Sequence, residues 1–303
     1  TGVQTCALPI LALLHGNEDT GLRAAQAVLG RHRQRPLPRA MSLFIGNVAA
    51  ARLGVRRLDE QPDYNRIWPG SIEPHTPEHD MMARVVAEMR ARRVFASVDV
   101  HNNSGLNPHY ACVSRLDPRA LHLGMLFSRT IVHFERPLGV QVSAFNDLCP
   151  AVTLECGKPG SAGSAEQVAE FIEGCLHLAE FPAHAPRPRD LDLYHTVATV
   201  KIAPGVTLSF EEDDSDLRLV RDLDHMNFCE LVPRTFWGHV RAGSPPPLEV
   251  TDASGASAFE RYFTVSHGEL RLARSVMPAM LTLDERAIRQ DCLCYLMERL
   301  ILP

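Results

Sequence analysis

The stretch LALLHGNEDTG, residues 11–21, joins an apolar run to a helical pattern through a turn that carries His15 and Glu18. The apolar run is typical of a strand buried on both faces, and the apolar spacing over residues 20–33 predicts a helix. In open α/β sheets, ligands bind at the carboxyl ends of such strands. His15 and Glu18 are two potential zinc ligands, and Gly16 allows the tight bend that keeps them close together.

Two later apolar runs also end on residues that can bind a metal or carry a proton. Residues 94–100 lead into His101, and residues 151–154 lead into Glu155. Two histidines and one carboxylate form the ligand set of hydrolytic zinc, because they leave one coordination position open. A further carboxylate is then needed to move protons, and Glu155 suits that role. The sequence therefore predicts one Zn²⁺ per chain, bound by both histidines and Glu18.

The composition excludes several classes of protein. The 303 residues are 45% hydrophobic and 22% charged, with a net charge of −5, so there is no basic excess to attract nucleic acid or anionic lipid. No apolar run approaches the roughly 18 residues that span a bilayer. The eight cysteines are scattered, mostly in apolar segments, and we expect them to be reduced core residues. We therefore expect a cytoplasmic protein with a small-molecule substrate; self-association is left open.

The chain is long enough for two domains. A proline-rich segment at 181–189 separates an α/β half from short strand-like runs punctuated by Gly, Pro, Asp and Asn. We therefore expect a catalytic domain over 11–185 and a β-rich domain over 186–303. Residues 1–10 match nothing that follows and resemble translated adaptor sequence, so we interpret them as a non-native leader. Within the first half, residues 119–134 are expected to be mainly helical.

Four short motifs resemble those of the succinylglutamate desuccinylase and aspartoacylase family, a branch of the zinc carboxypeptidase superfamily. They occur in the family's order: HGNE at 15–18, DYNR at 63–66, DVHN at 99–102 and LECG at 154–157. The resemblance implies an α/β fold with a zinc-carboxypeptidase-like mixed sheet flanked by helices, followed by a smaller β-rich C-terminal domain. It also implies a zinc-dependent deacylase that cleaves the amide bond of an N-acyl amino acid.

The resemblance assigns the same metal site as the strand ends do. His15, Glu18 and His101 match the family's zinc ligands, and Glu155 matches its general acid/base. Asp99 is a candidate partner that would fix a ligand imidazole, although a carboxylate in a strand-end turn needs no such role.

Further residues match the family's substrate-binding positions. Asn65 and Arg66 match a pair that binds the substrate's carboxylate, to which the guanidinium fork is suited. Arg57 matches an arginine that polarises the scissile carbonyl. This chain has one extra residue between Arg57 and Asn65, so Arg56 competes for that role. Asn102 either donates a hydrogen bond to substrate or caps its turn.

One departure from the family concerns the substrate. Enzymes that act on acetylaspartate or succinylglutamate carry an arginine shortly before the general base, where it binds a second carboxylate, but residues 143–147 read SAFND. Lys158 and Tyr262 are candidates to replace this arginine, although no spacing argument supports either residue. A less acidic N-acyl amino acid or a small amide is therefore an option beside a dianionic substrate, and the sequence leaves open whether the substrate carries a second carboxylate. The alternatives are a metallocarboxypeptidase that acts on short peptides and a non-catalytic binding protein of the same fold.

Overall fold

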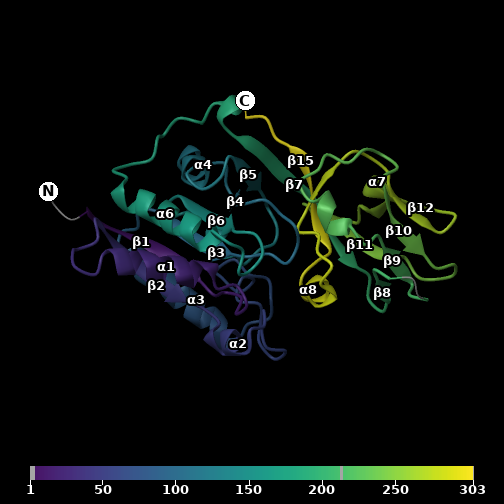
Figure 1. Ribbon diagram of the computed structural model, residues 1–303, viewed down its shortest axis with the longest axis horizontal. Helices are drawn as coiled ribbons and strands as arrows, with labels where there is room; N and C mark the ends of the chain where they lie inside the picture. Colours follow the sequence, from purple (N-terminus) through teal and green to yellow (C-terminus); the bar gives the residue numbers. More distant parts are fainter. Residues whose placement is uncertain (1–3, 212–213, 303) are drawn as a thin grey trace. The chain divides into compact units, whose positions relative to one another are not determined.

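The computed structural model describes residues 4–211 and 214–302, and the chain divides into two compact units (Figure 1). The second unit consists of Asn103–Pro108 and Tyr194–Leu300, and the first contains the remainder of the chain. The domain boundary expected after residue 185 stays a prediction, as does the non-native origin of residues 1–10. Of those ten residues, 1–3 lie outside the described part, and the next seven belong to the first strand.

The first unit is built on a mixed sheet. Its strands lie in the order β5 (Thr130–His133), β4 (Tyr110–Val113), β6 (Ala151–Glu155), β3 (Ser97–His101), β1 (Gln4–Ala12) and β2 (Arg39–Ile45). Neighbouring strands run parallel, except that β4 is antiparallel to β6. The carboxyl ends of β1, β3 and β6 therefore meet at one edge of the sheet, with His101 directly opposite Glu155 in the register of β3 and β6.

Helices cover both faces of this sheet. Helix α1 (Thr20–Arg31) approaches one face so closely that a Cβ on Gly21 would lie 2.8 Å from the Val100 Cβ. On the other face, α3 (Pro77–Ala91) buries Met82 and Met89 in a core cluster with Leu11. Further helices among the described residues of the first unit are α2 (Val48–Leu53), α4 (Pro118–Met125), α5 (Gln141–Phe145), α6 (Ser164–His177) and a short 3-10 helix at Pro188–Asp190. The α/β prediction is confirmed for this unit.

The helix expected over 119–134 is wrong in its second half. Helix α4 ends at Met125, and β5 occupies Thr130–His133. Thr130 and its next two residues, isoleucine and valine, are all β-branched, which favours a strand, and Ile131 is fully buried there. Pairing with β4 therefore takes precedence over the helical spacing.

The second unit is rich in β-structure, as predicted. One antiparallel group comprises β14 (Met277–Ala279), β15 (Cys294–Arg299), β7 (Asp192–Ile202) and β11 (Leu248–Asp252). A second, mostly antiparallel sheet has the order β12 (Phe263–Ser266), β13 (Glu269–Leu272), β10 (Phe236–Val240), β9 (Leu217–Leu219) and β8 (Leu208–Ser209). Short helices α7 (Phe259–Tyr262) and α8 (Glu285–Gln290) complete the unit, and Trp237 and Tyr262 are fully buried in its core.

Two expectations from composition concern helices and thiols. Within residues 4–211 and 214–302, no helix combines the length and apolar character needed to cross a membrane. The cysteines whose side chains are described are all free thiols, and most of them are buried, with Cys229 exposed. A reduced, mostly internal set of cysteines is therefore what the described part of the chain contains.

Candidate metal centre

The turn after β1 is held in a conformation that few sequences could adopt. Leu13 has a φ of 57°, in the left-handed region that non-glycine residues rarely occupy, and its carbonyl accepts a 2.6 Å hydrogen bond from the amide of Asn47. A Cβ on Gly16 would lie 2.3 Å from the amide nitrogen of Ala51, so only glycine fits there. After this bend the His15 imidazole lies beside the Glu18 carboxylate, with Nδ1 at 2.8 Å from Oε1.

The structure brings the three predicted metal ligands together at that edge. His15, Glu18 and His101 are all buried, and each offers one ligand atom within 4.8 Å of the other two. The Nδ1 atom of each imidazole lies 2.8 Å from a different oxygen of the Glu18 carboxylate. The amide of Asn102 also donates to Glu18, at 3.1 Å. Among the described residues this is the group whose chemistry and spacing suit a metal ion.

A second carboxylate holds the far side of each imidazole. The Nε2 of His101 donates to Asp99 at 2.8 Å, and the Nε2 of His15 donates to Asp63 at 3.0 Å. Such partners fix the orientation and tautomer of histidines that bind metals. The sequence named Asp99 as a candidate for this role. It did not single out Asp63, although the DYNR motif contains it.

The pKa shifts of the group follow from this arrangement. Burial and the Arg56 charge lower the pKa of His15, but Glu18 and Asp63 outweigh them and raise it above the usual value. Burial opposes the charge of His101 too, yet its two carboxylate neighbours raise its pKa well above the usual value. Burial would raise the pKa of Glu18, but the two imidazoles lower it. Each ring therefore holds its proton more tightly than a free imidazole does, and a cation would compete with that proton.

The two candidate arginines lie in different surroundings. Arg56 donates from Nη2 to Asp63 at 3.0 Å, and its Nη1 lies 3.7 Å from Glu18. Arg57 instead donates from Nη1 to the backbone carbonyl of Gln61 at 2.8 Å. Arg56 is thus the arginine that contacts the metal-ligand group. The catalytic role assigned to Arg57 stays a prediction.

Asn65 and Arg66 lie on a turn that Asp63 organises. The amide of Asn65 donates to the Asp63 carboxylate at 2.8 Å, and the Asn65 Nδ2 lies 3.3 Å from the Nε2 of His101. Arg66 donates from Nη1 to the carbonyl of Asn65, and Ser71 donates from Oγ to the carbonyl of Arg66. The turn therefore borders the metal ligands, and the assignment of both residues to substrate binding stays a prediction.

Asn102 and Glu155 complete the sheet edge. The Asn102 side chain accepts a hydrogen bond from the amide of Thr20 at 3.4 Å and donates to the carbonyl of Gly157 at 2.9 Å. It therefore joins the start of α1 to the loop after β6. Glu155 is the last residue of β6 and is buried beside His101 in the strand register. The predicted roles of both side chains toward substrate are not tested by these contacts.

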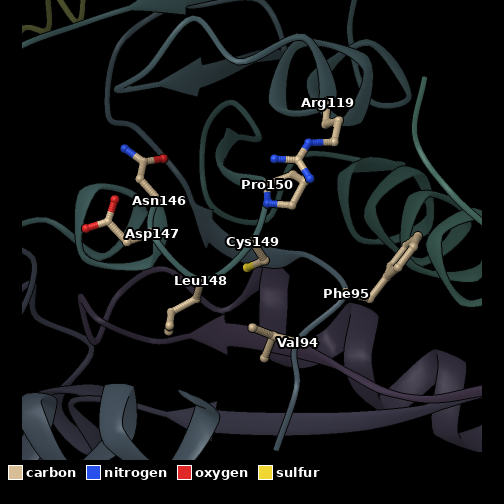
Figure 2. Close-up of a pocket in the computed structure, with 8 residues that line it drawn as sticks. All are labelled: Val94, Phe95, Arg119, Asn146, Asp147, Leu148, Cys149 and Pro150. Atoms are coloured by element: carbon tan, nitrogen blue, oxygen red, sulfur yellow. The ribbon is translucent and has the colours of Figure 1, made fainter. Parts of the chain in front are cut away.

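A cavity of about 240 Å³ lies at the other end of the same strands (Figure 2). Its walls include Val94 and Phe95, just before β3, and Cys149 and Pro150, just before β6. His101 and Glu155, by contrast, end these strands, so the cavity is not part of the metal-ligand group. Burial raises the pKa of Cys149 to about 12, which makes its thiol a poor nucleophile.

The mixed sheet and the buried group of His15, Glu18 and His101 define the class of protein: an α/β fold with a candidate metal site. No family model matches the sequence, and no curated protein sequence is detectably similar to it. Similarity to known proteins is found in their solved structures. Solved structures of succinylglutamate desuccinylases and aspartoacylases match over almost the whole chain. The fold that the sequence motifs imply is therefore confirmed.

Three solved structures illustrate the match, one of them a succinylglutamate desuccinylase. Succinylglutamate desuccinylase from Chromobacterium violaceum is 17% identical, with a TM-score of 0.60 and coverage of 99% of this chain and 86% of that one. Murine aminoacylase 3 is 14% identical, with a TM-score of 0.66 and coverage of 99% and 97%. A product-bound ectoine utilization protein from Ruegeria pomeroyi is 14% identical, with a TM-score of 0.59 and coverage of 98% and 86%. At these identities the likeness establishes the fold alone.

Proposed function

We propose that this protein is a zinc-dependent deacylase that cleaves the amide bond of an N-acyl amino acid, or of a similar small amide, into a carboxylate and a free amine. The observation that carries the proposal is the buried group of His15, Glu18 and His101 at the same sheet edge as Glu155. The fold is shared with desuccinylases and with an aminoacylase, which supports the same reaction class.

The donor set fits zinc better than a hard cation. It offers two imidazole nitrogens and one carboxylate, whereas calcium and magnesium prefer oxygen ligands. Each imidazole is also tied by Nε2 to a carboxylate, Asp63 or Asp99, which leaves Nδ1 directed at the ligand position. When bound there, Zn²⁺ would lower the pKa of a water molecule and polarise the substrate's carbonyl.

Glu155 is proposed as the general acid/base. Its backbone lies at the end of β6, opposite His101 in the strand register, and Glu155 is not one of the three residues in the candidate metal group. In the proposed reaction it accepts the proton of the attacking water and passes it to the leaving nitrogen, so that the amine departs neutral.

Asn65, Arg66 and an arginine beside Glu18 are proposed to bind the substrate. Asn65 and Arg66 bind its carboxylate, through an amide and a guanidinium fork. For the arginine that acts on the scissile carbonyl, the contacts favour Arg56 over Arg57, because Arg56 lies 3.7 Å from Glu18 while Arg57 is held by a backbone carbonyl. Asn102 holds the surrounding loops, and a further hydrogen bond to substrate would come from the same side chain.

The substrate is proposed to lack a second carboxylate, in its acyl group or in its amino acid. Residues 143–147 carry no cation, and Asp147 pairs with Arg115. Of the two substitutes that the sequence suggests, Tyr262 is buried in the core of the second unit, while Lys158 is exposed. Acetyl or formyl derivatives of neutral amino acids are therefore proposed as better substrates than succinyl derivatives or derivatives of acidic amino acids.

The test is a hydrolysis screen of zinc-loaded protein over N-acetyl, N-formyl and N-succinyl amino acids, with short unblocked peptides alongside. We expect turnover of neutral N-acyl amino acids, and we expect Glu155→Gln to bind zinc normally while losing about 10²–10⁴-fold in rate. Cleavage of the unblocked peptides instead would indicate the carboxypeptidase. Zinc binding without turnover of any substrate class would indicate a binding protein, and a Glu155→Gln rate near that of the wild type would remove Glu155 from the mechanism.

A further inference from the structure

The Asp63 carboxylate accepts hydrogen bonds from three different parts of the site. Its Oδ1 accepts hydrogen bonds from the Nε2 of His15 at 3.0 Å and from the amide of Asn65 at 2.8 Å, and its Oδ2 accepts one from Arg56 at 3.0 Å. The side chain is 11% exposed, so these partners are the main source of its solvation. Burial opposes its charge, yet His15 and Arg56 hold the pKa of Asp63 well below its usual range.

Asp99 provides a natural comparison within the same site. It plays the corresponding role for His101, with Oδ2 2.8 Å from Nε2, and its side chain is fully buried. Its other oxygen, Oδ1, has no hydrogen-bond partner among the described residues. Asp99 therefore orients one imidazole, whereas Asp63 contacts an imidazole, a guanidinium and the turn that carries Asn65.

We propose that Asp63 is a positioning residue that couples the metal ligand His15 to Arg56 and to the Asn65–Arg66 turn. The inference rests on the metal site of the proposed function but not on its substrate. His15 and Arg56 share the Asp63 carboxylate. The electrostatic stabilisation that Asp63 provides at His15 therefore depends on how strongly Asp63 interacts with Arg56. Because such coupling is reciprocal, a cation bound by His15 also changes how firmly Arg56 is held.

This arrangement gives the site a property that the two ligand histidines alone would not have. Arg56 lies between Glu18, at 3.7 Å, and Asp63, at 3.0 Å. Removing its positive charge reduces repulsion of the metal, and it also leaves His15 and the Asn65 amide as the hydrogen-bond partners of Asp63, with no guanidinium beside them. The first effect needs no Asp63, whereas the second exists only when residue 63 is a carboxylate. The effect of an Arg56 substitution on metal affinity must therefore depend on residue 63 and not on residue 99.

The experiment is a pair of double-mutant cycles on the full-length chain, with Zn²⁺ affinity measured by competition against a chromogenic chelator. One cycle combines Arg56→Gln with Asp63→Asn, and the matched control combines Arg56→Gln with Asp99→Asn. We expect each Asp→Asn change alone to weaken zinc binding by about 10–100-fold. Arg56→Gln should strengthen zinc binding in the wild type. The same substitution in the Asp63→Asn background should give a gain in affinity at least about fivefold smaller. In the Asp99→Asn background the gain should be similar to that in the wild type.

Each outcome decides the inference. Additive effects of Arg56→Gln and Asp63→Asn, or equal coupling in both cycles, would overturn it. A residue with a merely structural role would lower the thermal stability of the metal-free variants without this non-additivity, so melting curves of all variants accompany the titrations. Failure of the wild-type chain to bind zinc at all would contradict the proposed function itself, whereas zinc binding with additive cycles would contradict only the coupling through Asp63.

Discussion

Two buried carboxylates, Glu18 in the first unit and Asp216 in the second, are both held in the ionised form, but by donors of different kinds. Asp216 accepts hydrogen bonds from the amide and hydroxyl of Thr207, at 3.0 and 2.8 Å, from the hydroxyl of Ser244, at 2.8 Å, and from Arg241. These bonds lower its pKa. Glu18 is held mainly by the imidazoles of His15 and His101.

The difference lies in whether the donors around the carboxylate can lose their protons near neutral pH. Amide, hydroxyl and guanidinium donors keep their protons across the physiological range, so the Asp216 cluster is complete without any bound ion. The donors of Glu18 are titratable, and losing their protons would leave three lone-pair donors facing one another. Only protons or a cation can therefore stabilise the group formed by Glu18, His15 and His101. This contrast is the physical basis for assigning a metal site to one cluster and none to the other.

The largest effect on either carboxylate group is expected at Glu18, from shortening the chain so that it begins at residue 11, because β1 leads into the turn that carries Glu18. The cut removes Leu8 and Ile10, which are fully buried in β1, and it removes much of the pairing with β2. Each lost side chain is worth about 2–5 kcal/mol, which together approaches the stability of a typical domain. We expect loss of zinc binding and of cooperative unfolding in circular dichroism. A shortened chain that binds zinc like the full chain would contradict this role of β1.

A smaller effect is expected from pH. The raised pKa values of His15 and His101 mean that their contribution to stability is complete below about pH 6.5 and is lost as the pH rises through the higher folded-state values. Asp216 has a lowered pKa, so its contribution is constant over this range. The free energy of unfolding of the metal-free protein should therefore fall as the pH rises above about 6.5. Each tenfold difference in proton affinity between the folded and unfolded chain contributes about 1.4 kcal/mol to that fall.

The measurement for this prediction is urea unfolding between about pH 6.5 and pH 9 with a chelator present. Added zinc should reverse the trend, because metal binding requires imidazoles without the Nδ1 proton. In His101→Ala the free energy of unfolding should fall less as the pH rises, since one of the two imidazoles with a raised pKa is gone. A metal-free wild type whose stability did not change with pH would show that the imidazoles do not carry the protons assigned to them.

The smallest effect is expected at the structural carboxylate. Asp216→Asn keeps the shape of the side chain but loses the charge that Arg241 and the two hydroxyls solvate. We expect the unfolding midpoint to fall by a few degrees while zinc stoichiometry and affinity stay at wild-type values. Differential scanning calorimetry and metal analysis of the same sample would measure both. A change in zinc affinity would mean that the two clusters are not the independent cases described above.

The same physical contrast explains how much the sequence could predict. The clustering of His15, Glu18 and His101 was predictable because they lie where apolar strands end, and carboxyl ends of neighbouring strands share one sheet edge. The role of Asp63 was not, because it depends on a loop with no periodicity that returns to the sheet edge 48 residues after His15. The choice between Arg56 and Arg57 depends on a shift of one residue in that same loop, which spacing alone cannot resolve.

Elements were missed where local pattern and tertiary pairing disagree. The strand β5 was hidden within an apparently helical stretch, and its β-branched residues were the signal that could have revealed it. The helix α2 is short and follows β2 at once, begun by Asn47, whose side chain accepts from the amide of Ala50. The asparagine cap was visible in the sequence, but the six residues that follow carry too little periodicity to predict a helix.

The central claim is that His15, Glu18 and His101 bind a metal cation in place of protons, and calorimetric titration of Zn²⁺ into the metal-free chain tests it most directly. The titration is run in two buffers of different ionisation enthalpy, with wild type, His101→Ala and Asp216→Asn. We expect one equivalent of zinc to bind to the wild type and to Asp216→Asn with net release of protons, and binding to His101→Ala to be lost. A wild type without saturable binding, or a His101→Ala variant that binds zinc as tightly, would contradict the claim.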